Sequence, residues 1–143
     1  MIAIGSDHAG YELKEKLKNH FESNLLLKDY GTNSSNSCDY PLIAEKVSNA
    51  VSSGECEKGI LICGSGIGIS IAANKIKGIR AALCYNTELA QMARLHNDAN
   101  IVCLGARFTS LDDSINIVKV FLNTPFEFGR HERRINQIKE LEK

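Results

Sequence analysis

Residues Leu61–Ser70 read LICGSGIGIS: an apolar run ends in a cysteine, a glycine-rich turn follows, and apolar residues then return. A buried strand that passes through glycines into a helix is typical of α/β proteins with a parallel sheet. Cys63 lies between the run and the turn. A thiol in that position is either a small buried hydrophobe, which is the commoner case, or a base or nucleophile beside free backbone amides.

The same alternation of strand and helix extends over the rest of the chain. Short apolar runs predict five buried strands, at Ile2–Ile4, Leu25–Lys28, Gly59–Cys63, Arg80–Cys84 and Ile101–Leu104. Helical spacing of apolar residues predicts helices over Leu13–Phe21 and Ile43–Val51, from near Ile69, from near Thr87, and after a Ser110–Asp113 cap. We therefore expect an α/β fold: a single-domain, doubly wound parallel five-stranded sheet, Rossmann-like, forming an α/β/α sandwich over residues 1–143.

The composition favours a small-molecule partner. The 143 residues carry 17 basic and 17 acidic side chains, so the net charge of zero argues against nucleic-acid binding. The sequence contains no apolar segment of membrane length and no signal-peptide pattern at its amino terminus. We expect a cytoplasmic protein that contacts neither membrane nor nucleic acid.

The cysteines and histidines show no metal-binding spacing. Five cysteines form no CxxC pair, and an odd number in a reducing compartment predicts free thiols. The four histidines show no HxxxH or HExxH pattern, so tertiary contacts alone would have to assemble a metal site. We expect no metal and no cofactor.

The glycine-rich turn is not a nucleotide-binding motif. It follows the third predicted strand, Ile69 replaces the last glycine of GxGxxG, and no Lys-Ser or Lys-Thr pair follows it. It is either a tight strand-to-helix turn or a nest of amides that binds an oxyanion or phosphate. A helix amino terminus stabilises a nearby anion by about 0.3–1 kcal/mol, which would favour a thiolate at Cys63.

Other polar residues stand where a doubly wound sheet binds ligands, beyond the carboxyl ends of its strands. We expect the site in the loops or helix ends that carry Gly5–Gly10, Gly64–Gly68 and His96–Asn97. Asp7 and His8 either face a ligand or cap the next helix, and His96 either binds a ligand or satisfies terminal carbonyls. Arg130, Arg133 and Arg134 share a helical face, which is either simply solvated or a phosphate clamp.

A last amphipathic helix, from about Arg130 to Leu141, has no strand after it. Ile135, Ile138 and Leu141 lie on one side, and the helix's own domain would bury them poorly. We therefore expect the helix to pack on a second subunit, in a homodimer or a larger assembly such as a tetramer.

Taken together, the motifs resemble the ribose-5-phosphate isomerase B family, which is related to the subunits of galactose-6-phosphate isomerase. The resemblance runs nearly end to end, through IGSDHAG, DYP, ILICGSGIGISIAANK, GIRAAL, HNDAN, LGAR and GRHERR in the same order. It implies a metal-free aldose-ketose isomerase that interconverts ribose 5-phosphate and ribulose 5-phosphate through an enediolate. It also implies a site shared between two subunits.

The resemblance also implies roles for individual residues. Cys63 matches the general base, His96 matches the group that opens the sugar ring, and Ser65 positions the sugar or relays a proton. The implied oxyanion and substrate ligands are Asp7, His8, Gly64, Gly66, Ile67, Gly68, Asn97, Arg107, Arg130 and Arg134.

Two alternative functions stay open at this point. The long irregular segment Gly31–Asp39 leaves the sugar length open, so a hexose 6-phosphate such as allose or galactose 6-phosphate is the first alternative substrate. The second alternative is a non-catalytic sugar-phosphate-binding protein on the same fold.

Overall fold

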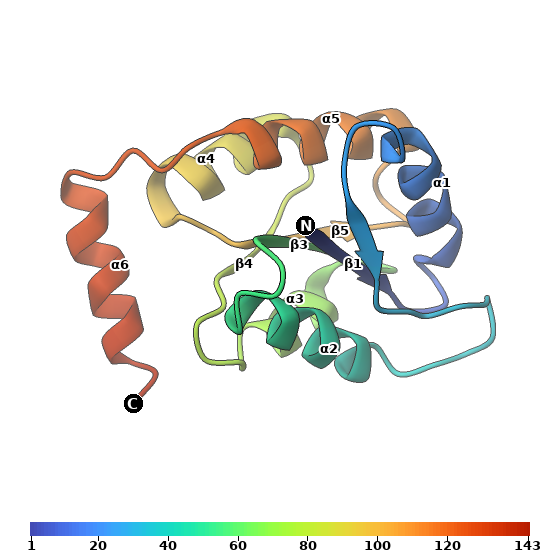
Figure 1. Cartoon of the computed structure of the whole chain (residues 1–143), viewed down its shortest axis with the longest axis horizontal. Coiled ribbons are helices and arrows are strands. Elements are labelled where there is room, and N and C mark those ends of the chain that lie inside the picture. The colour runs from blue at the N-terminus through green and yellow to red at the C-terminus, as the bar shows by residue number, and fades with distance from the viewer.

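The computed structural model describes residues 1–143 and contains the strands that the sequence predicts (Figure 1). They are β1 (Ile2–Ser6), β2 (Leu27–Asp29), β3 (Lys58–Cys63), β4 (Ala81–Leu83) and β5 (Ile101–Gly105). The helices are α1 (Tyr11–Phe21), α2 (Tyr40–Ser52), α3 (Ile67–Ala73), α4 (Thr87–Asn97), α5 (Leu111–Asn123) and α6 (Arg130–Glu140). None of them is both long and apolar enough to cross a membrane.

Two strands are displaced or shortened relative to the prediction, because other groups take the backbone amides at their ends. β2 begins at Leu27 since the amide of Leu25 still donates to the carbonyl of Phe21, in the turn that closes α1. β4 begins after Arg80, whose amide donates to the side chain of Asn100. Neither donor is then free for the sheet.

The strands form one parallel sheet in the order β2-β1-β3-β5-β4, which confirms the predicted doubly wound architecture. Helices α1, α4 and α5 cover one face, and α2 and α3 cover the other (Figure 1). The chain therefore leaves the neighbouring strands β1 and β3 toward opposite faces. Parallel sheets open a ligand crevice at such a point, beyond the carboxyl ends of the strands.

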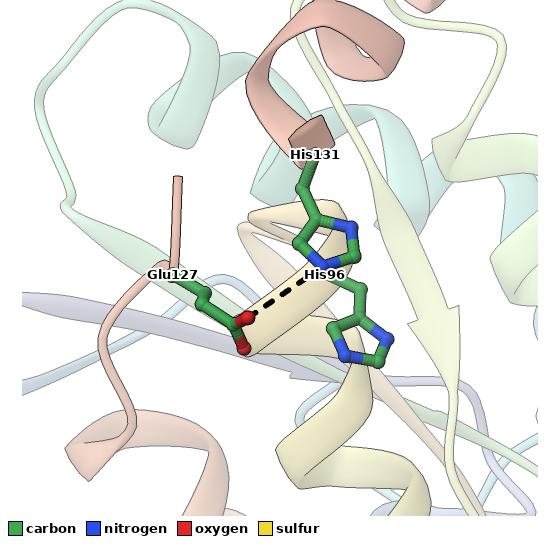
Figure 2. A group of neighbouring side chains, drawn as sticks. All are labelled: His96, Glu127 and His131. Atoms are coloured by element: carbon green, nitrogen blue, oxygen red, sulfur yellow. Dashed lines mark ion pairs between the residues drawn. The ribbon is translucent and has the colours of Figure 1, made fainter. Parts of the chain in front are cut away.

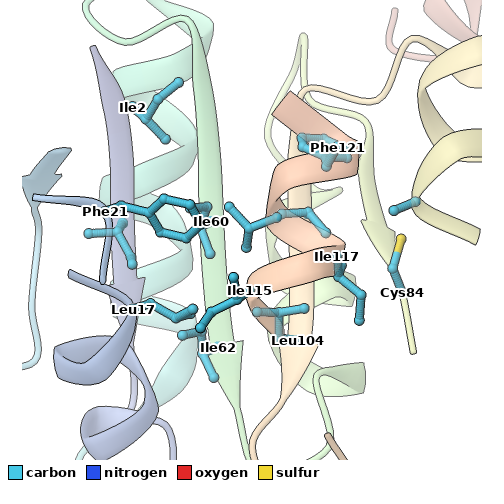
Figure 3. Packing of buried hydrophobic residues seen from close by; sticks show 14 of the residues in the cluster. Ile2, Leu17, Phe21, Ile60, Ile62, Cys84, Leu104, Ile115, Ile117 and Phe121 are labelled. Carbon is cyan, nitrogen blue, oxygen red and sulfur yellow. The ribbon is translucent and has the colours of Figure 1, made fainter. Parts of the chain in front are cut away.

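Two apolar layers hold the sheet between its helices. Figure 3 shows one of them, where Leu17 and Phe21 pack with Ile60, Ile62 and residues of α5. Leu61 and Cys63 alternate with those isoleucines and belong to the opposite layer, with α2 and α3. The strand period therefore directs the Cys63 side chain to the face from which α3 starts.

Helix α6 stands apart from both layers at one end of the molecule (Figure 1). The prediction of a poorly buried apolar side holds for Ile138 and Leu141, which are exposed, but is wrong for Ile135, which its own chain buries. Between α6 and the segment that follows α3 lies a cavity of about 580 Å³, whose lining includes Ile79, Ile138 and Leu141.

Candidate active site

Cys63 ends β3, where the neighbouring strands β1 and β3 both reach their carboxyl ends. The residue is only 4% exposed, and its Sγ accepts a hydrogen bond of 3.1 Å from the amide of Gly66. Gly66 has a left-handed φ of 81°, and a Cβ there would lie 3.0 Å from the backbone of Leu104. Only glycine fits this turn, and the turn points an N–H at the sulfur, an arrangement that stabilises negative charge.

The glycine-rich turn is joined to the end of β5 by backbone contacts. The carbonyls of Cys63 and Gly64 accept from the amides of Ala106 and Arg107, at 2.9 and 3.0 Å. The side chain of Arg107 lies over Gly64, since a Cβ on that glycine would be 2.8 Å from Nη1. The structure thus brings Arg107, which the resemblance implies as a substrate ligand, to the thiol loop.

Not every amide of the loop is free for a ligand. Gly66 donates to the thiol, and the amide of Ile67 donates to Ser65 Oγ at 3.1 Å. The expected row of amides is therefore partly used within the loop itself. It leaves the amides of Gly64, Ser65 and Gly68 as the candidates for an oxyanion.

Two tyrosines beside this loop escaped the sequence analysis. A Cβ on Gly68 would lie 2.6–2.8 Å from ring atoms of Tyr40, and the hydroxyl of Tyr85 donates to the carbonyl of Ser65 at 2.7 Å. Tyr40 belongs to the DYP motif, so its position after the long irregular segment was an available signal. For Tyr85 the sequence offered none.

Asp7 and His8 directly follow β1, the strand beside β3. One oxygen of the buried Asp7 accepts from the amide of Gly10 at 3.1 Å, so this side chain does hold the turn before α1. His8 Nδ1 accepts from the amide of Cys38 at 3.2 Å, which ties the segment Gly31–Asp39 to the loop after β1. An acceptor Nδ1 places the proton on Nε2, which is left to donate to a ligand.

Two other cysteines are structural thiols, as expected. Burial raises the pKa of Cys84 to about 11, and burial also raises that of Cys103 well above its ordinary value. Both sulfurs therefore stay protonated.

His96 lies at the end of α4 and does not cap that helix. The carbonyl of Asn97 accepts from Arg80 Nε at 2.9 Å, and that of Leu95 accepts from the amide of Glu127 at 3.0 Å. These two donors remove the capping explanation for His96. Its ring instead stacks on that of His131, with centroids 4.3 Å apart (Figure 2).

The start of α6 contributes to the same region. Burial, with the charges of His96 and Arg130 beside it, holds the pKa of His131 below its ordinary value, and Arg134 acts in the same direction. Arg130 and Arg134 are exposed. The structure thus gathers His96, Asn97 and the two arginines at the junction of α4 and α6.

This second group lies at the amino edge of the sheet, where the strands begin. Cys63 lies at the carboxyl edge, where the strands end. β5 starts at Ile101, shortly after α4 ends, and reaches Cys63 only at its last residue, where Gly105 pairs with it. A strand of this length spans about 13 Å. The expectation that His96 and Asn97 lie with the thiol loop is therefore wrong within one chain, because α4 runs back along the sheet before it ends.

The chain matches a family profile described as Ribose/Galactose Isomerase over residues 2–138. It is 45% identical to ribose-5-phosphate isomerase B of Escherichia coli (strain K12), over 99% of this chain and 95% of that protein. The structure of Clostridium thermocellum ribose-5-phosphate isomerase B matches with a TM-score of 0.97 at 50% identity, covering 99% and 96% of the two chains. Mycoplasma genitalium ribose-5-phosphate isomerase B, solved with bound ribulose-5-phosphate, matches with a TM-score of 0.94 at 42% identity, covering 99% and 95%.

Proposed function

This chain belongs to the ribose/galactose isomerase family, and from that premise we propose that it interconverts ribose 5-phosphate and ribulose 5-phosphate. The observation that carries the proposal is the Gly66 N–H directed at Cys63 Sγ, at the carboxyl end of a central strand of a doubly wound sheet. The names of the relatives supply the substrate, and the thiol beside amide donors supplies the chemistry.

Cys63 acts as the general base. As a thiolate it removes the proton from C2 of the open aldose, and the electron pair of that C–H bond forms the enediolate. The amides of Gly64, Ser65 and Gly68 hold the developing oxyanion. The thiol then returns the proton to C1 while the hydroxyl on C2 becomes the carbonyl, and Ser65 Oγ relays that hydroxyl proton to the negatively charged oxygen on C1. A positioned base contributes about 10²–10⁴ in rate, and one oxyanion donor about 10²–10³.

A second copy of the chain completes the site. Ribose 5-phosphate must open its ring first, which requires His96 to exchange a proton with the ring oxygen or the anomeric hydroxyl. Because His96 and Cys63 lie at opposite edges of one sheet, His96 reaches the thiol only from another subunit. We therefore propose a homodimer with two equivalent sites, each formed by both chains.

The phosphate is bound away from the reacting carbons. Arg130 and Arg134 lie on the exposed start of α6 and bring forked donors that suit a phosphate. Arg107 and His8 approach it from the thiol side, and Asp7 and Asn97 bind sugar hydroxyls. The exposed Leu141 and Ile138 of α6 are the residues that packing on the second copy would bury.

A substrate panel tests the function directly. The purified chain is given ribose 5-phosphate, allose 6-phosphate and galactose 6-phosphate, and kcat/KM is measured for each. We expect the highest value for ribose 5-phosphate. A higher value for a hexose phosphate would reassign the substrate, and binding without turnover would reduce the protein to a sugar-phosphate-binding role.

A further inference from the structure

The junction of α4 and α6 contains a cluster of side chains that the proposed reaction does not use in full. His96, Glu127 and His131 each offer one ligand atom, and these atoms all lie within 4.8 Å of one another (Figure 2). The residues come from α4, from the segment before α6 and from α6 itself. The cluster is therefore assembled by tertiary contacts alone.

One member of the cluster has a buried nitrogen without a partner. His131 is 6% exposed, and its Nε2 makes no hydrogen bond. The nearest carboxylate atom, Glu127 Oε1, is 3.9 Å away, which is too long for a hydrogen bond. A buried imidazole nitrogen without a partner is unfavourable, so an ion that accepts its lone pair would be favoured there.

We propose that this cluster binds a divalent transition-metal ion of the zinc type, with His96, His131 and Glu127 as its ligands. Two imidazoles and one carboxylate are a set that zinc takes, with a further position left open for water. Zinc ligands lie about 2.0–2.2 Å from the metal, which places ligand atoms about 3.4 Å apart in a tetrahedron. Closing the cluster requires shifts of about 1 Å, within reach of Glu127, which is 53% exposed, and of the partly exposed His96.

The expected consequence of binding is inhibition. This consequence rests on the proposed function, in which His96 exchanges protons with the sugar ring. A metal bound to the ring nitrogen of His96 occupies the lone pair that would accept the proton. The nearby Arg130 and Arg134 limit the affinity for the metal because they repel the cation. The ion is thus a regulator or inhibitor of the enzyme and takes no part in turnover.

Calorimetric titration of the full-length protein with Zn²⁺ tests the site without any assay of activity. We expect one ion per chain for the wild type and at least a tenfold weaker affinity for Glu127→Gln, given the 10–100-fold effects seen even for outer-shell partners. Glu132→Gln is the matched control, because it removes the same charge beside His131 without removing a ligand of the cluster. Titration with Co²⁺ should give the intense visible absorption of a tetrahedral site, and Glu127→Gln should weaken it.

Several outcomes would overturn the proposal. Equal Zn²⁺ affinities for Glu127→Gln and Glu132→Gln would remove Glu127 as a ligand, and loss of binding in Cys63→Ser would place the ion on the thiol. His131→Asn should weaken binding while His20→Asn, a matched change on the exposed side of α1, should not. The inhibition is measured separately, as loss of isomerase turnover that EDTA reverses and that Glu127→Gln resists. A chain that binds Zn²⁺ but turns over no ribose 5-phosphate would refute the function and leave the metal site standing.

Discussion

The carboxyl and amino edges of the sheet provide different kinds of functional group. At the carboxyl edge a glycine turn holds a thiol that is only 4% exposed, and the Gly66 amide donates to its sulfur. At the amino edge long side chains on two helix ends supply them, and Arg130 and Arg134 are exposed. A base that removes a proton from carbon needs a fixed position, whereas long exposed side chains can hold a phosphate. In the proposed reaction, neither edge suffices alone.

The largest expected effect comes from removing the thiol at the carboxyl edge. Cys63→Ala should lower kcat for ribose 5-phosphate by about 10²–10⁴, because the general base is lost. Binding of ribose 5-phosphate, followed by calorimetry, should change little, since the phosphate ligands lie on other elements. Cys63→Ser is the control of nearly equal size, and it should also be inactive at neutral pH. Turnover close to wild type in the alanine variant would reject Cys63 as the base.

The carboxyl edge also depends on a buried ion pair for its shape. Lys14 Nζ is fully buried, lies 2.6 Å from Asp29 Oδ2, and donates to the carbonyl of Thr32, where the segment Gly31–Asp39 begins. Asp29→Asn should therefore lower the free energy of unfolding by about 2–3 kcal/mol, measured by urea denaturation. The exposed pair Lys28–Glu55 is the matched comparison, and Glu55→Gln should change stability by less than about 1 kcal/mol.

The same pair gives a pH dependence with a definite sign. Burial raises the pKa of Asp29, but hydrogen bonds from Lys14, Lys18 and the Gly31 amide outweigh it, so the folded pKa lies below the ordinary value of 3.8. The unfolded chain then takes up the proton first as the pH falls. The stability that Asp29 contributes is complete above the unfolded value and is lost as the pH drops through the folded one. The gap between wild type and Asp29→Asn should close over that range, and a constant gap would contradict this account.

Mixing two inactive variants tests whether the Cys63 and the His96 of one site come from different chains. In a dimer of Cys63→Ala with His96→Asn, one site retains both groups and the other loses both. After random exchange half of the dimers are mixed, so we expect recovery of about one quarter of the wild-type activity. Unmixed preparations of each variant serve as controls. No recovery after verified exchange would mean that each site is formed within one chain.

The smallest effect is expected at the exposed arginines. Arg134→Ala should raise KM for ribose 5-phosphate roughly tenfold with little change in kcat, because a charge-assisted hydrogen bond to phosphate contributes about 1.5–3 kcal/mol. Arg133 is the matched control, since it is a neighbouring exposed arginine on α6 without an assigned role. An unchanged KM in Arg134→Ala, or an equal effect in Arg133→Ala, would rule out Arg134 as a phosphate ligand.

Much of the fold was predictable because it depends on local periodicity. The strand from Gly59 to Cys63 and the apolar stripe Leu13, Leu17 and Phe21 have the expected elements and burial. The errors arose at element ends, as at Leu25 and Arg80, where a turn or a side chain takes the amide. Such competition depends on contacts across the fold, which periodicity does not encode.

The candidate site was only partly predictable for the same reason. The glycine turn is local, so its relation to Cys63 followed from the sequence. The position of His96 depends on the length and direction of α4, and the freedom of its ring depends on Arg80 and the amide of Glu127, which donate to the helix carbonyls instead. Tyr85 reaches Ser65 from another strand end, a contact that no local pattern indicates.

The separation of Cys63 from His96 by the length of β5 has a genetic consequence. In a cell that makes two alleles of a shared-site dimer, a chain lacking only Cys63 spoils one site of each mixed dimer and leaves the other working. A chain lacking both Cys63 and His96 spoils both sites, because each draws one missing group from it. With random pairing, two lesions on one allele beside a wild-type allele would leave about one quarter of the full activity, half of what a chain lacking only Cys63 leaves. The same lesions divided between two alleles would also leave about one quarter, although neither chain is active alone.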